Sequence, residues 1–169
     1  MGLSNTSISL NVSGILTKAL DLGEGQAPFP LSAVLNLLSG TGAGQADLVF
    51  ADQRTLNASA NENLDFAGGL TDAFGASITM ARLKALIVYA APGNTNDVNV
   101  IRPASNGVPW ALAAGDGVNV APNEFKVLVC RGDATGIVVT AGTGDLINFA
   151  NSGAGTPVTY TVIAIGASA

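Results

Sequence analysis

The residues of this chain that could do acid–base or metal chemistry are three pairs of carboxylates. They are Asp47 with Asp52, Glu62 with Asp65, and Asp65 with Asp72. Two acids facing each other across an aromatic-lined cleft can hydrolyse a glycosidic bond, and acids spaced along one loop can bind Ca²⁺. None of these pairs has the spacing of a calcium loop, and aromatic residues make up only 5% of the chain. We therefore interpret these acids as solvated residues of turns.

Nucleophilic and metal chemistry lack their usual residues. The sequence contains no histidine, which removes the commonest general base and the commonest metal ligand. Cys130 is the only cysteine, so neither an intrachain disulfide nor a Cys/His zinc site can form. Because it follows the apolar run Val127–Val129, we expect a buried, inert thiol. The sequence predicts no catalytic residue, no cofactor and no metal site.

Two short motifs have functional counterparts elsewhere, but each is better explained by a turn. Arg131-Gly132-Asp133 matches an integrin-type tripeptide, yet Gly and Asp are ordinary turn residues. Residues 39–45 carry three alternating glycines but no following Lys-Ser/Thr, as a phosphate-binding loop would require. We expect an exposed loop at the first and a flexible loop at the second.

Composition excludes several classes of protein. With 169 residues, 48% apolar and 11% charged, the chain predicts one folded domain. The net charge is −5 and the seven cations are scattered singly, which argues against nucleic-acid binding. No run is long enough to span a membrane and the first residues do not form a signal peptide, so we expect a soluble protein made in the cytoplasm.

The longest apolar segment without Gly or Pro, residues 77–91, is the expected central strand. A four-turn helix is the alternative, because residues 81–86 are good helix formers. The strand is favoured because no capping box precedes the segment and Pro92-Gly93 closes it. Its alternation predicts that one face carries Leu83, Ala85, Ile87 and Tyr89.

Further strands follow from the same alternation and from glycine-rich turns. We expect residues 31–38 to form a hairpin with 46–56, and residues 77–91 to form one with 97–102. Residues 156–165 predict a strand locked inside a sheet. Eight or so strands predict an all-β, single-domain antiparallel β-sandwich of the jelly-roll kind.

The first thirty residues leave two alternatives open. Ile8, Leu10 and Val12 alternate with polar residues, and residues 23–30 (GEGQAPFP) fit neither a helix nor a central strand. Residues 1–30 are therefore either an extended N-terminal arm or the first strand pair, and residues 31–169 form the β-sandwich domain.

Several short motifs occur in an order that resembles a known family. They are DQRTL (52–56), NLD (63–65), GGLTDAFG (68–75), KAL (84–86), APGNTN (91–96), DATG (133–136), TAGTGD (140–145) and Asn151-Ser152. The family is that of small tailed-bacteriophage virion proteins, most similar to capsid decoration (cement) proteins. The match covers about residues 52–165, and residues 1–30 lie outside it.

The resemblance implies a function based on contact. Such proteins bind the outer surface of the assembled head as dimers or trimers and clamp neighbouring capsomers. The implied partners are the major capsid protein and copies of the chain itself, with no nucleic acid and no membrane. The implied location is the capsid surface of the virion, after synthesis in the host cytoplasm. The family has no catalytic residues to transfer, in agreement with the residue analysis.

Candidate interface residues are the apolar residues of the N-terminal section and of one later loop. They are Ile8, Leu10, Val12, Phe29, Trp110 and Leu112. Trp110 is the only tryptophan, and either an interface anchor or a cap on its own core explains it. The alternative function is a receptor- or glycan-binding module of a phage tail fibre or tail tip, since sandwiches of this kind serve there too.

Overall fold

The computed structural model describes residues 3–4, 6–129 and 136–169. Every regular element within these ranges is a β-strand. The strands pair almost entirely antiparallel, and the two largest sheets pack against each other, so the predicted all-β sandwich is confirmed. The strand rather than the helix is also confirmed for the segment around residue 85.

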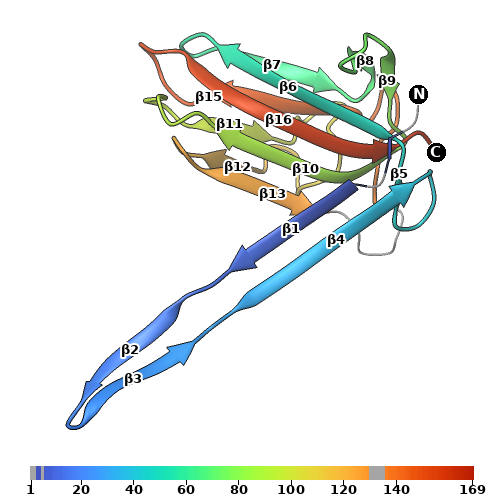
Figure 1. The fold of residues 1–169 in the computed structure, drawn as a ribbon. Helices are drawn as coiled ribbons and strands as arrows, with labels where there is room; N and C mark the ends of the chain where they lie inside the picture. Colours follow the sequence, from blue (N-terminus) through green and yellow to red (C-terminus); the bar gives the residue numbers. More distant parts are fainter. Residues whose placement is uncertain (1–2, 5, 130–135) are drawn as a thin grey trace.

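The body of the molecule is a sandwich of two sheets (Figure 1). One sheet, here called the arm-side sheet, has the order β13-β10-β16-β6, with β14 also paired to β10; the far sheet has the order β12-β11-β15-β7. The arm-side strands are β6 (Leu48–Leu56), β10 (Arg82–Ala90), β13 (Phe125–Val129), β14 (Ile137–Val138) and β16 (Val158–Ala167). The far-sheet strands are β7 (Asn61–Asp65), β11 (Val98–Ile101), β12 (Gly117–Val120) and β15 (Leu146–Asn151). The chain crosses repeatedly between the two sheets, and the resulting strand order is that of a jelly roll.

The main core lies between the two sheets. Inward-facing residues alternate along each strand, as on β16, where Val158, Tyr160 and Val162 are fully buried. Across the core the ring of Tyr160 stacks on Phe149 of β15, with ring centroids 4.9 Å apart. β16 pairs with β10 on one side and β6 on the other, so the prediction of a strand locked inside a sheet is confirmed.

The predicted central strand is interrupted. Residues 77–91 form β9 (Ser77–Thr79), which pairs with β8 (Ala67–Thr71), and then β10 after a break at residues 80–81. The pairing of β10 with β16 shifts between Leu83 and Ala85. This bulge turns Leu83 into the main core, whereas Ala85 faces the opposite side of the sheet. The expectation that these two residues share a face is therefore wrong.

The two predicted hairpins are also wrong. β4 (Leu31–Ser39) pairs with β1 (Thr6–Val12) rather than with β6, and β10 and β11 belong to different sheets. The reason is that local alternation specifies a strand but not its partner, which depends on long-range burial.

The N-terminal strands form a long hairpin that projects from the body (Figure 1). Its base pairs β1 with β4, and its tip pairs β2 (Ile15–Leu20) with β3 (Gly23–Pro28). We call residues 6–39 the arm. The boundary proposed at residue 30 falls within the arm, between β3 and β4 on its returning side. The arm is anchored where β5 (Gln45–Ala46) runs parallel to β4, and where Leu35 and Leu37 pack on Ala85 and Ile165 in a second apolar cluster.

Candidate interaction surface

The base of the arm has one apolar face. Ile8, Leu10 and Val12 of β1 lie opposite Leu35, Ala33 and Leu31 of β4, in that order. Residues on one face of an antiparallel pair contact across the strands, so these six side chains form one strip. On the other face a polar pair is linked by a hydrogen bond from Ser32 Oγ to Asn11 Oδ1 at 2.8 Å. The alternation expected for residues 7–12 is confirmed.

The tip of the arm is almost uncovered. Leu16 is 69% exposed, Leu20 is 58% exposed and Leu22 is fully exposed. Opposite Leu16 and Leu20 the returning strand carries only Ala27 and Gly23, so no large side chain across the strand pair covers the two leucines. β2 and β3 form a separate two-stranded sheet, and such a pair is at best marginally stable in water. The tip therefore leaves its leucines without cover from the described part of its own chain.

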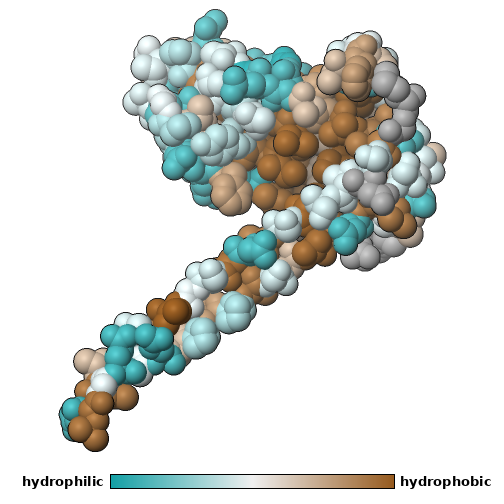
Figure 2. Space-filling model, in the orientation of Figure 1, coloured by the Kyte–Doolittle hydropathy of each residue, from teal (hydrophilic) through white to brown (hydrophobic). Residues whose placement is uncertain are grey.

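The arm-side sheet is apolar on its outer face as well as in the core. Ile87 lies between Ile163 and Val127, and Ala85 lies between Ile165 and Val129. Figure 2 shows this apolar area between the body and the arm. The arm covers only part of it, because Phe125, Val127 and Val129 stay exposed. The sheet thus presents an apolar surface that continues into the base of the arm.

A groove of about 600 Å³ lies where the arm leaves the body. One wall is the base of the arm and the other is the outer face of β13. It is lined by Ile8, Ser9, Leu10, Asn11, Ala33, Val34, Leu35, Phe125, Val127 and Val129. No lining residue is charged, so the groove is suited to apolar side chains rather than to ions.

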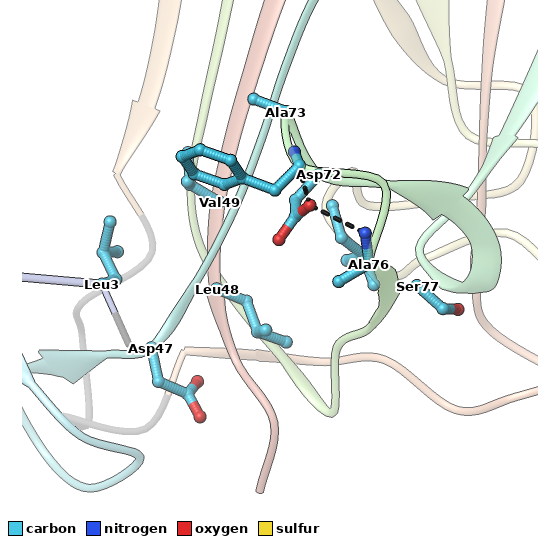
Figure 3. A pocket seen from close by; sticks show the side chains of 10 residues that line it. Leu3, Asp47, Leu48, Val49, Asp72, Ala73, Ala76 and Ser77 are labelled. Carbon is cyan, nitrogen blue, oxygen red and sulfur yellow. Dashed lines mark hydrogen bonds between the residues drawn. The ribbon is translucent and has the colours of Figure 1, made fainter. Parts of the chain in front are cut away.

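A smaller depression of about 350 Å³ lies between the start of β6 and the loop joining β8 to β9 (Figure 3). Its two acids are engaged in holding the backbone. Asp72 Oδ1 accepts hydrogen bonds from the N–H groups of Phe74 and Ala76, at 2.8 and 2.9 Å. Asp47 Oδ1 accepts one from the N–H of Ser168 at 2.9 Å. These carboxylates order a turn and the C-terminal segment, and they do not converge on a common point.

Glu62 departs from the expectation of a solvated turn acid. It lies within β7, and its carboxylate accepts hydrogen bonds from Arg54 Nε at 2.9 Å and from Tyr160 Oη at 2.9 Å. Burial alone would raise the pKa of Glu62, but these hydrogen bonds outweigh it and the pKa lies below its usual value. Burial, together with the hydrogen bond to Glu62, raises the pKa of Tyr160, which keeps the phenol protonated. The group is an ionic clamp between the two sheets.

The structure brings some candidate interface residues together and separates others. Ile8, Leu10 and Val12 share the apolar face of the arm, and Phe29 lies at the joint between base and tip. Trp110 packs against the main core of its own chain, although its buried Nε1 has no hydrogen-bond partner among the described residues. Leu112 lies in the same loop, fully exposed, and that loop is held by Arg102, whose Nη1 donates to the carbonyl of Ala111 at 2.7 Å.

The described part of the chain contains no group of three or more acidic or cysteine side chains that could hold a metal ion. Over the same ranges no helix has the length and hydropathy needed to cross a membrane. Cys130 and the tripeptide 131–133 lie outside the described residues.

Two parts of the surface are not among the residues predicted from the sequence. The first is the tip, where Leu16, Leu20 and Leu22 interrupt a segment of irregular alternation. The second is β13, whose alternating Phe125, Val127 and Val129 form an exposed row. The apolar alternation of Phe125, Val127 and Val129 on one face, with Leu128 beside the charged Lys126 on the other, was the available signal.

Comparison of the chain with protein-family models, with curated proteins and with solved structures gave no match.

Proposed function

We propose that this chain is a non-enzymatic virion structural protein, a capsid decoration (cement) protein that binds the outer surface of a phage head and stabilises contacts between neighbouring capsomers. Its partners in this proposal are the major capsid protein and copies of itself. The arm and the exposed loops make the contacts.

The observation that carries the proposal is the arm. It projects from a rigid sandwich and leaves ten large apolar side chains exposed: Leu10, Val12, Ile15, Leu16, Leu20, Leu22, Phe29, Leu31, Val34 and Leu38. Soluble monomers rarely expose apolar patches larger than a few hundred Å² unless the patch binds something. A long apolar hairpin is suited to reaching over a neighbouring subunit, and repetition across a lattice multiplies modest contacts.

The acids support a contact function in a different way. Asp47, Asp72 and Glu62 each hold a part of their own fold by hydrogen bonds, so none of the three is poised for acid–base chemistry. Jelly rolls occur both in viral capsid proteins and in lectins, so the fold alone does not separate the proposal from the glycan-binding alternative.

Immunogold labelling of purified virions of the phage that encodes this chain tests the location. Regular labelling of the head is the expected result. Labelling confined to the tail, or strong binding on a glycan array, would overturn the proposal.

The role of the arm is tested with heads that lack the protein. Adding back the full-length chain should raise the temperature at which these heads release DNA. The double variant L16S/L20S should restore less than half of that gain, whereas Phe74→Ser, an equally exposed apolar residue away from the arm, should restore all of it. Equal restoration by both variants would remove the arm from the mechanism.

A further inference from the structure

We propose that two copies of this chain exchange arms, so that the tip of each arm fills the groove at the base of the other. The proposal deepens the proposed function by naming the first partner of the arm, and it rests on that function only for its biological setting. It follows from four features of the described residues.

The first feature is that both surfaces are uncovered in one chain. The tip presents Leu16, Leu20 and Leu22, and the groove presents Leu10, Phe125 and Val127. Lys18 lies between Leu16 and Leu20 on the same face of β2. Its aliphatic stem can lie along an apolar wall while the amine stays at the rim. The tip and the groove are therefore chemically complementary.

The second feature is distance, which excludes the chain's own tip as the occupant. Leu10 lines the groove and Leu20 lies ten residues further along nearly extended chain, a separation of about 33 Å. The arm points away from the body over this length (Figure 1). Only a second molecule can place a tip in the groove without a reversal of the arm.

The third feature is symmetry. In a two-fold contact each surface on one copy meets its complement on the other. The midpoint between Leu10 and Leu20 along the chain is Ile15, next to the joint between base and tip. A two-fold axis across the arm at this joint sets the two arms antiparallel. The same two-fold rotation then places the tip of each copy in the groove of the other.

The fourth feature is area. From Leu10 to Leu22 the arm is about 40 Å long and about 10 Å wide, so one face offers about 400 Å². With about 100 Å² from the exposed row of β13 in each groove, two reciprocal contacts reach about 1,000 Å², the lower bound for a stable biological interface. One tip placed in one groove without the reciprocal contact would bury roughly half of that. The area therefore favours reciprocal exchange, and it leaves the other face of each arm for the shell.

Cysteine cross-linking of the full-length protein tests the geometry. In a Cys130→Ser background, Asn11→Cys in the groove is combined in turn with Leu20→Cys and Leu22→Cys at the tip. Within one chain these positions are about 30 Å apart, far beyond disulfide reach, so any disulfide between groove and tip joins two copies. We expect covalent dimers for at least one pair, with the N11C–L20C or N11C–L22C linkage identified by mass spectrometry. The control pair Phe74→Cys with Leu22→Cys, which places one cysteine outside both arm and groove, should give none.

Sedimentation of the same proteins tests the energetics. The wild-type chain should sediment as a dimer, and L16S/L20S should weaken dimerisation at least tenfold. Phe74→Ser, which removes an exposed apolar side chain from the loop between β8 and β9, away from the arm, should leave it unchanged. A monomer, a trimer, or a dimer without groove-to-tip linkage would overturn the exchange. Because these assays use no virions, a failure here leaves the labelling of heads to decide the proposed function separately.

Discussion

The hydroxyl of Tyr160 donates a hydrogen bond to Glu62 Oε1 at 2.9 Å and so joins the two sheets of the sandwich. Tyr160 belongs to β16 of the arm-side sheet, and Glu62 belongs to β7 of the far sheet. Arg54 of β6 donates to the same carboxylate from the arm-side sheet. The clamp fixes the body from which the arm projects, and its strength can be measured.

Tyr160→Phe should lower the free energy of unfolding by about 1–2 kcal/mol, because a hydrogen bond to a charged, mostly buried carboxylate is lost while the ring stays. Urea denaturation of the purified chain measures the change. Tyr89→Phe is the matched control, since its hydroxyl donates to Asn123 Oδ1 at 3.0 Å on the exposed surface. Equal effects of the two variants would show that the clamp adds nothing beyond an exposed hydrogen bond.

The free energy of unfolding should also fall in acid, because the folded state lowers the pKa of Glu62. Its ordinary value is 4.5, and the folded state holds it lower despite burial, through hydrogen bonds from Arg54 and Tyr160. The stabilisation is therefore complete above about pH 4.5 and is lost as the pH falls through the folded pKa.

Glu62→Gln should flatten this part of the acid unfolding curve, measured as urea midpoints between pH 6 and pH 3. Glu124→Gln is the exposed control. Lys126 lowers the pKa of Glu124 too, but solvent screens that pair. An unchanged acid slope in the Glu62 variant would place the pH dependence elsewhere.

Gly166→Ala should destabilise the chain by about 1–3 kcal/mol, because it overpacks the sheet. A Cβ at this position would lie 2.5 Å from the carbonyl oxygen of Arg82 and 2.5 Å from Met80 Sδ. The carbonyl belongs to the backbone beside the bulge and cannot move aside cheaply. Thermal unfolding measures the loss, and Gly93→Ala, which has open space around it, should change it by less than about 0.5 kcal/mol.

Amide hydrogen exchange in the tip of the arm should depend on protein concentration. β2 and β3 pair only with each other, so they open readily until a second copy covers them. We expect residues 15–28 to exchange rapidly in dilute solution and slowly in concentrated solution, while β16 stays protected in both. Protection of the tip that is the same at all concentrations would contradict this prediction.

The sequence by itself determined the class of fold and one face of the arm. Alternation over residues 7–12 placed Ile8, Leu10 and Val12 together, and the glycine-rich turns with β-branched runs predicted a sandwich. These features are local, because the two-residue alternation of side chains and the turn residues both involve neighbouring positions in the chain.

Only the tertiary structure decided which strands pair and which apolar residues stay uncovered. Between the paired strands β1 and β4 the chain runs out through the whole tip and back. The bulge between Leu83 and Ala85 reverses the faces of β10. The clamp between Glu62 and Tyr160 arises from residues distant in the chain. Such contacts depend on the packing of whole sheets, for which a single sequence carries no local signal.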